Sequence, residues 1–184
     1  MELENISYEQ IQPFFDSLGK EEKELLGIPL NYVLSADYIC GVKVGDELAG
    51  IGGYIKSYRF VPSSFDVVAS KFQGKGIGNE LHKRRLEFAR KHYSYAVSSV
   101  GNPETHQASL HLYYKHGSKC FYKKGNTIWL CISFNQKGKI ICKVLPFIYS
   151  TFHLAGRLPL GVKMLNKTYE SILERQTRIN STKR

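Results

Sequence analysis

The stretch FQGKGIGNEL, Phe72 to Leu81, places glycine at positions 74, 76 and 78 directly before a helical pattern. Glycine costs roughly 0.5–1 kcal/mol relative to alanine in regular structure, so three alternating glycines need a physical reason. One reason is an anion, because a helix N-terminus carries free N–H groups and partial positive charge, and glycine lets a phosphate approach the backbone. The alternative is a surface turn, and the loop by itself does not decide between the two.

Two well-known phosphate loops do not fit this stretch. A nucleotide P-loop needs Gly-Lys followed by Ser or Thr, and Gly76 follows Gly74-Lys75 here, which excludes a Walker-type NTPase. A dinucleotide fingerprint needs glycine at position 79, where the chain has Asn79, and the neighbouring strands have an antiparallel pattern. The pattern that fits is Q-x-x-G-x-G, over Gln73 to Gly78.

The rest of the chain supplies strands before the loop and a mixture of helices and strands after it. Gly45-Asp46 and Gly125-Asn126 are typical of hairpin turns, and Asn102, Pro103 and Gly117 are typical of helix ends. The order predicts an α/β (α+β) domain with a mixed, mostly antiparallel sheet flanked by helices. The predicted strands are Met1–Ile6, Tyr38–Val44, 48–60, Val61–Ala69, Tyr95–Val100, Lys119–Lys124 and Thr127–Phe134, and the predicted helices are Tyr8–Leu18, Lys20–Leu26, Ile77–His92 and one that begins at Asn102.

The loop and its surroundings resemble the GNAT superfamily of N-acetyltransferases. Upstream, Val68-Ala69-Ser70-Lys71-Phe72 is similar to the family's V-x-P-x-Y/F pattern, with Ser70 in place of the proline. Downstream, SLHLYYKHG, Ser109 to Gly117, is similar to the family's A-x-x-L-Y-x-K-x-G helix. The resemblance extends over residues 1–135 and therefore implies a GNAT-like fold for that part of the chain.

The resemblance implies acetyl-CoA as the acyl donor and direct attack of an acceptor amine on its thioester. Pantetheine would pair with the backbone near Val68 and Ser70, and backbone N–H groups from Gln73 to Asn79 would hold the diphosphate. A longer acyl group is also compatible with the loop, which contacts only the CoA end. The implied cofactor-binding residues are Val68, Ser70, Gln73, Gly74, Lys75, Gly76, Ile77, Gly78 and Asn79.

Tyr113 occupies the family's L-Y position, which implies that it protonates the departing thiolate. Asn102 lies eleven residues before Tyr113, whereas the family often has an Asn seven residues before it, so Tyr114 stays an alternative. The general base is left open between Asp66, Glu104, a water chain and a backbone carbonyl. No metal is expected, because histidines 106, 111 and 116 are each turned by about 140° from the last on a helix.

Charge divides the chain into two parts. The net charge is +10, and residues 137–184 carry ten Lys or Arg and two Glu, 10 − 2 = +8. We therefore predict a GNAT-like domain over 1–136 and a basic helical extension over 137–184, broken into short helices by Pro146, Gly156, Pro159 and Gly161. The favoured interpretation of the extension is a cap packed on the core through apolar residues such as Leu145, Phe147 and Ile148. The alternative is that it binds a polyanion.

The acidic, polar start MELENISYEQ is unlike a targeting segment, and no run of about 18 apolar residues is present. The four cysteines have no CxxC spacing and are expected to be reduced thiols, so a cytoplasmic protein is expected. The expected partners are acetyl-CoA and an unidentified amine, and a homodimer is compatible with the sequence. The alternative function is a non-catalytic module on the same fold that binds acyl-CoA or a polyanion (nucleic acid or an anionic membrane).

Overall fold

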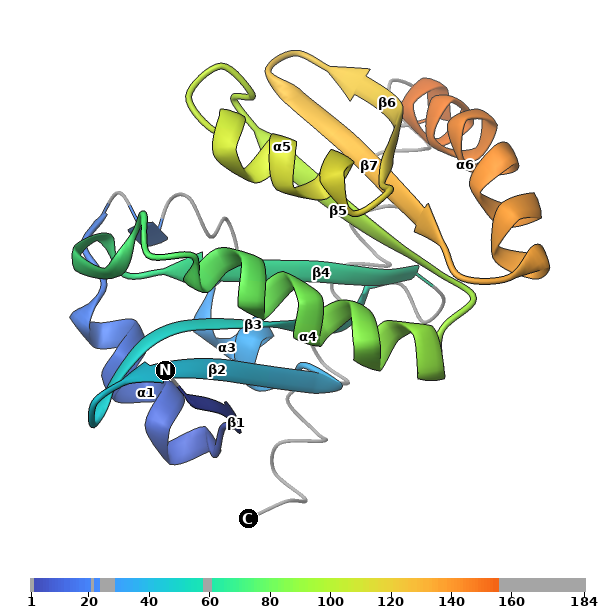
Figure 1. Ribbon diagram of the computed structural model, residues 1–184. Coiled ribbons are helices and arrows are strands. Elements are labelled where there is room, and N and C mark those ends of the chain that lie inside the picture. Colours follow the sequence, from blue (N-terminus) through green and yellow to red (C-terminus); the bar gives the residue numbers. More distant parts are fainter. Residues whose placement is uncertain (1, 21, 24–28, 58–60, 156–184) are drawn as a thin grey trace. The chain divides into compact units, whose positions relative to one another are not determined.

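The computed structural model describes residues 2–20, 22–23, 29–57 and 61–155. In these residues, seven strands form one sheet in the order β1-β2-β3-β4-β5-β7-β6, and only the pairing of β4 with β5 is parallel (Figure 1). The predicted fold class is confirmed. The strands are β1 (Glu2–Asn5), β2 (Tyr38–Val44), β3 (Glu47–Ser57), β4 (Val61–Val68), β5 (Tyr95–Gly101), β6 (Lys119–Lys124) and β7 (Thr127–Ser133).

The described helices are α1 (Tyr8–Ser17), α3 (Leu30–Leu34), α4 (Ile77–His92), α5 (Gln107–Lys115) and α6 (Gln136–Ala155). Helix α4 covers one face of β2, β3 and β4, and α1 and α3 cover the other face (Figure 1). A short turn of 3₁₀-helix, Ser70–Phe72, joins β4 to the glycine loop. The predicted helix Lys20–Leu26 lies partly outside the described residues, and α3 was not predicted.

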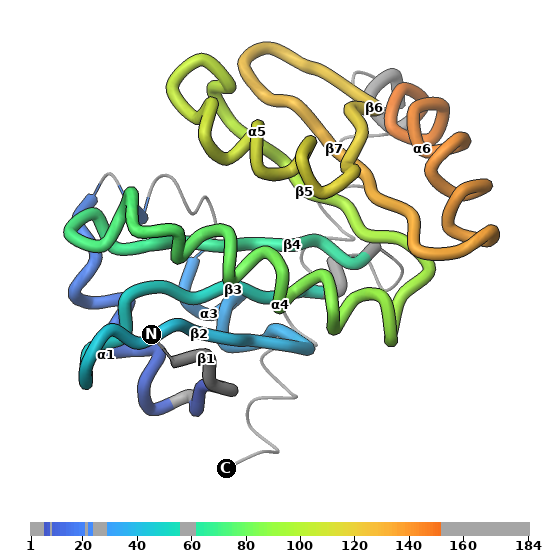
Figure 2. Tube along the Cα trace, viewed as in Figure 1, coloured from blue at the N-terminus to red at the C-terminus, as the bar shows by residue number. Residues whose placement is uncertain are grey.

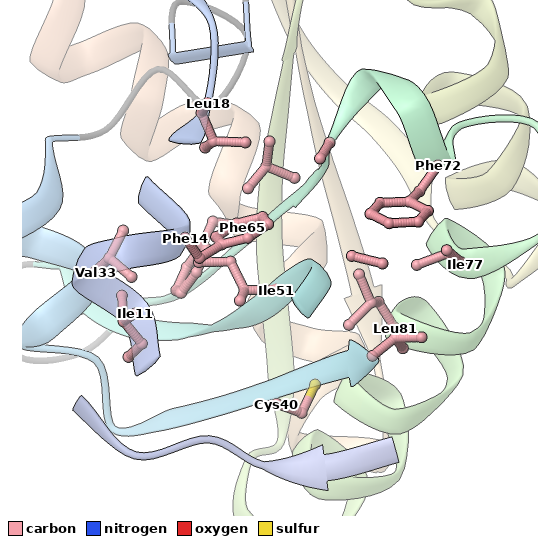
Figure 3. Close-up of a cluster of buried hydrophobic side chains, with 14 of the residues drawn as sticks. Ile11, Phe14, Leu18, Val33, Cys40, Ile51, Phe65, Phe72, Ile77 and Leu81 are labelled. Carbon is pink, nitrogen blue, oxygen red and sulfur yellow. The ribbon is translucent and has the colours of Figure 1, made fainter. Parts of the chain in front are cut away.

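The hydrophobic core lies where α1, α3 and α4 pack against β2, β3 and β4. Its side chains come from segments far apart in the sequence, so the helices on both faces fix the same strands. This buried layer supports β4, the strand that leads into the glycine loop. Figure 3 labels the cluster members Ile11, Phe14, Leu18, Val33, Cys40, Ile51, Phe65, Phe72, Ile77 and Leu81.

Helix α5 begins later than the sequence predicts. Asn102 has φ 43, in the left-handed region, and its carbonyl accepts hydrogen bonds from the N–H groups of Thr105 and His106. Residues 102–106, which were expected to form the first helical turn, form this closed turn instead. The helix therefore starts at Gln107. The predicted end is confirmed, because His116 ends the helix and Gly117 follows with φ 93.

Helix α6 is continuous through Pro146, where the sequence predicted a break, and the breaks predicted at Gly156, Pro159 and Gly161 lie outside the described residues. Asn135 caps its N-terminus by accepting from the Gly138 N–H at 2.9 Å. Pro146 lies inside the helix, where it removes one backbone donor without ending it. Backbone contacts divide the chain into residues 1–142 and 143–184. No helix in the described part of the chain is long and apolar enough to cross a bilayer.

Gly53 lies in the middle of β3, and the structure predicts that a methyl group there will destabilise the sheet. A Cβ at this position would collide with the Tyr38 carbonyl oxygen and lie 2.7 Å from the Phe65 ring. We expect Gly53→Ala to lower the free energy of unfolding by about 1–3 kcal/mol in thermal denaturation. Gly101→Ala is the matched control, because a Cβ at position 101 would have nothing within 4 Å. The free energy of unfolding of this variant should stay within about 0.5 kcal/mol of the wild type. Equal melting temperatures for the two variants would contradict this packing.

Candidate functional site

The central feature of the site is the separation of β4 from β5. A single residue pair, Ser63 with Val97, is in register between them in the described structure, whereas β3 and β4 pair over eight residues. The two traces separate from this pair toward their C-terminal ends (Figure 2). Beyond Ser63, therefore, the β4 edge that faces β5 lacks the ladder of hydrogen bonds that a strand normally makes.

Val68 is the last strand residue on this open edge. The Ala69 N–H donates to the Ala49 carbonyl on β3 at 3.0 Å, and strand polar groups alternate between the two edges, so those of Val68 point toward β5. The Val68 carbonyl accepts a hydrogen bond from the Gln73 side-chain amide at 3.2 Å. The Gln73 side chain therefore holds the loop against the strand end.

The backbone N–H of Ser70, the other residue expected to pair with a ligand, is already hydrogen-bonded to a side chain. Its N–H donates to the carboxylate of Glu22, which also accepts from the Gly19 N–H. Burial alone would raise the pKa of Glu22, but the hydrogen bonds from Ser70 and Gly19 outweigh it and lower that pKa. Glu22 was missed in the sequence because its partner is 48 residues away and it has no motif of its own.

The glycine loop presents a row of free donors. Gly74 and Gly76 have φ 74 and φ 80, which require glycine, and a Cβ at either would have no heavy atom within 4 Å. The Gln73 N–H donates to Ser70, and the Asn79 N–H donates to Gly76. Among the described hydrogen bonds none uses the five N–H groups between them, from Gly74 to Gly78. These donors surround the N-terminus of α4, where a helix favours negative charge.

Gly78 differs from the other two glycines. It has no positive φ, and a Cβ there would touch only Val68 Cγ2, at 4.0 Å. The protein backbone therefore does not require glycine at this position, whereas close approach of a ligand to its N–H would. The charge of Lys75 lies nearby, with Nζ 5.2 Å from the Phe72 ring centroid.

Helix α4 brings a buried cation to the same region. Arg85 is 1% exposed, and it donates to the Asp66 carboxylate and, at 2.9 Å, to His82 Nδ1. Gly52 makes room for it, because a Cβ there would lie 3.1 Å from Arg85 Cδ. In the sequence, Arg85 belongs to the basic run Lys83-Arg84-Arg85, a pattern that is typical of a solvated helix face. In the structure it is buried instead, because it pairs with Asp66 on β4.

The ionisation of this buried group is set by its neighbours. Burial disfavours the charge of Arg85, but Asp66, followed by Tyr113 and Tyr54, more than compensates and raises its pKa. Burial, with the charges of Arg85 and His116, lowers the pKa of His82 to about 2, so His82 is neutral. Because Nδ1 accepts from Arg85, its proton is on Nε2. His82 Nε2, Arg85 Nε and Arg85 Nη1 are buried donors without a partner among the described residues.

Tyr113 lies where β4, β5 and these donors meet. Its side chain is 5% exposed, and its hydroxyl is 3.3 Å from Ser64 Oγ, which is in turn hydrogen-bonded to Ser98 on β5. The His82 ring stands edge-on to it, with centroids 4.9 Å apart, and Arg85 Cζ is 5.9 Å from its ring centroid. The alternative residue, Tyr114, is 44% exposed and has none of these contacts among the described residues.

Neither carboxylate suggested as a general base has the geometry of one. Asp66 is bound to Arg85, and Glu104 is exposed before the start of α5. The three histidines at 106, 111 and 116 do not converge either. His106 contacts Thr105, whereas His116 Nε2 lies 3.2 Å from Asn79 Oδ1 and ties the end of α5 to the first turn of α4.

Solved structures, among them two that are described as acetyltransferases, are similar to this arrangement of strands and helices. A putative acetyltransferase, yncA from Salmonella typhimurium, solved with its cofactor acetyl-CoA, is 13% identical with a TM-score of 0.58, covering 74% of this chain and 95% of that one. A GNAT family acetyltransferase from Elizabethkingia anophelis with acetyl-CoA bound is 24% identical with a TM-score of 0.54, covering 72% and 97%. PH1933 from Pyrococcus horikoshii OT3 is 27% identical with a TM-score of 0.56, covering 73% and 98%.

The sequence comparison is more specific than the likeness of folds. No curated protein matches the chain significantly. Residues 3–117, however, match the sequence model of the Acetyltransferase (GNAT) family, and this range contains the open β4 edge, the glycine loop, α4 and Tyr113. The chain therefore belongs to the GNAT family of acetyltransferases.

Proposed function

We propose that this protein is an acetyl-CoA-dependent N-acetyltransferase whose activity resides in residues 1–136. The proposal is carried by three features that follow one another along the loop and β4. They are the five N–H groups from Gly74 to Gly78, the open strand edge at Val68, and the Tyr113 hydroxyl beside Ser64. Ser64 lies four residues before Val68, about 13 Å along an extended strand, so an extended ligand arm from the loop would reach Tyr113. A cytoplasmic location belongs to this proposal, because all four cysteines are free thiols.

Each part of acetyl-CoA has a chemically matched group on the protein. The diphosphate would accept hydrogen bonds from the N–H groups of Gly74 to Gly78, with Lys75 adding positive charge. The pantetheine amides would pair with the backbone of Val68, as a strand pairs with a sheet edge. The Ser70 N–H is bound to Glu22, so it would not donate to pantetheine. Ser70 would instead help to form the turn between β4 and the glycine loop.

In the reaction, the acceptor amine forms a bond to the thioester carbon and the carbon–sulfur bond breaks. The amine loses a proton and the departing thiolate gains one. Tyr113 would give its hydroxyl proton to the thiolate, and the negative charge left on its oxygen would be stabilised by the nearby Arg85 cation and the unpartnered His82 N–H. With Asp66 paired and Glu104 exposed, a water chain would carry the proton from the amine to solvent, and a backbone carbonyl would orient the amine or the water by accepting a hydrogen bond.

Gly78→Val tests the diphosphate site without straining the backbone. We expect the melting temperature to change little, because a Cβ at this position meets only Val68 Cγ2, at 4.0 Å, and the backbone there has no positive φ. The dissociation constant for CoA should rise at least about tenfold in calorimetry, since the valine would occupy the space of the diphosphate. Binding of acetyl-pantetheine, which lacks the diphosphate, should be unchanged, and Lys91→Val on the last turn of α4 is the control. Unchanged CoA affinity in folded Gly78→Val would show that the loop is only a turn.

Tyr113→Phe removes the proposed acid and keeps the ring that packs in the core. We expect kcat to fall by roughly a hundredfold or more, while the dissociation constant for acetyl-CoA stays within about threefold. Tyr114→Phe is the matched control and should keep its activity. Full activity of Tyr113→Phe with a loss in Tyr114→Phe would move the role to the neighbouring residue.

Asp66→Asn separates a structural ion pair from a general base. The variant leaves the Arg85 charge buried without its carboxylate, so we expect a loss of about 3 kcal/mol in the free energy of unfolding. Below its melting temperature the remaining activity should keep the pH dependence of the wild type, and Glu104→Gln should alter neither quantity. A stable Asp66→Asn protein that has lost catalysis would instead identify Asp66 as the base.

A further inference from the structure

Helix α6 has an apolar face that is not buried. Ile140, Val144, Phe147 and Ile148 are spaced by four, three and one residues, so they lie on one side of the helix, and they are 59%, 46%, 77% and 39% exposed. Phe147 and Ile148 were expected to be buried in a cap, and that expectation is wrong for both. Leu145, on another side of the helix, is buried as expected. Helix α6 thus has apolar residues on a buried side and on an exposed side.

The charges beside this face all have one sign. Helix α6 contains Lys137, Lys139 and Lys143, all exposed, and no Asp or Glu. None of the three lysines forms an ion pair with a described carboxylate. Lys143 falls beside the apolar stripe, next to Phe147, and Lys137 falls at the N-terminal end of the stripe itself. The long side chains of both lysines would reach a polar layer while the apolar stripe is covered.

These charges limit what can cover the stripe. A second copy of α6 would bring lysines against lysines with no carboxylate to neutralise them. The sequence from residue 156 to 184 has the same net sign, with seven Lys or Arg and two Glu, so its charges do not neutralise these lysines either. Nucleic acid would match the charge but would leave an exposed phenylalanine and three aliphatic side chains without an apolar partner.

We infer that α6 is a docking surface for an anionic membrane, on which it lies parallel to the bilayer plane. An amphipathic helix with aromatic and aliphatic residues on one face and lysines beside it binds at the boundary of headgroups and acyl chains. Phe147 and its apolar neighbours enter this boundary, and the lysines contact acidic headgroups. The inference is independent of the proposed catalysis, since no residue of the acyl-donor site lies on α6.

Sedimentation of the full-length protein with vesicles tests this surface. We expect binding to phosphatidylcholine vesicles that contain about one third phosphatidylserine, and much weaker binding to pure phosphatidylcholine. Phe147→Ala should weaken binding about tenfold, because a buried phenylalanine side chain is worth that much. Tyr114→Ala, an exposed aromatic elsewhere, is its matched control. The combined change of Lys137, Lys139 and Lys143 to Gln should also weaken binding, more than the same change at the exposed Lys91, Lys119 and Lys123.

Three results would overturn the inference. The first is no binding to acidic vesicles by the wild-type protein. The second is binding that the lysine changes abolish but Phe147→Ala leaves intact, with equal affinity for duplex DNA, which would indicate a general polyanion site. The third is self-association in solution that Phe147→Ala abolishes, which would assign the stripe to a second copy of the chain.

Discussion

The structure depends on one unfinished pairing in its sheet. Two parallel strands, β4 and β5, share a single registered pair and then separate, and this leaves backbone donors and acceptors that a folded protein normally satisfies. The surrounding residues compensate in part. The Gln73 side chain binds the Val68 carbonyl, Glu22 binds the Ser70 N–H, and Ser64 and Ser98 join the strands through their hydroxyls. What these contacts leave open are the β4 edge at Val68 and the N–H groups of Gly74 to Gly78, and a ligand with amides and a diphosphate is suited to complete both.

A second constraint is the cost of burying the charge of Arg85 beneath α4. A buried guanidinium is stable only when it is paired and hydrogen-bonded, and Asp66 and His82 supply both. The pairing has a geometric consequence, because it fixes α4 to β4 next to the α5 residue Tyr113. The contacts that stabilise the buried Arg85 charge therefore also position groups around Tyr113, the proposed acid. They leave N–H donors of Arg85 and His82 without a described partner in the same region. Stability and the proposed chemistry depend on the same few residues.

The sequence predicted the parts of the structure that are encoded locally. The hairpin glycines, the apolar spacing of Ile77–His92 and the end of α5 at Gly117 each reflect a conformational preference of nearby residues, and each is confirmed. The start of α5 was wrong because Asn102 can either cap a helix or close a left-handed turn, and only its contacts decide. The continuity of α6 through Pro146 was missed because a proline removes a single hydrogen bond, which tertiary context can offset. Glu22, Arg85 and the serine pair could not be predicted, because each depends on a partner that is distant in the sequence.

In the proposed complex, backbone amides from the β4 edge and the glycine loop hold the acyl donor. The most direct test is a titration of ¹⁵N-labelled protein with CoA, followed residue by residue in amide NMR spectra. We expect large shifts of the N–H resonances of Val68 and of Gly74 through Gly78. The N–H groups of Ser70, Gln73 and Asn79, which already have protein acceptors, should shift less. Saturable binding that leaves the Gly74–Gly78 resonances unchanged would show that these amides do not hold the acyl donor.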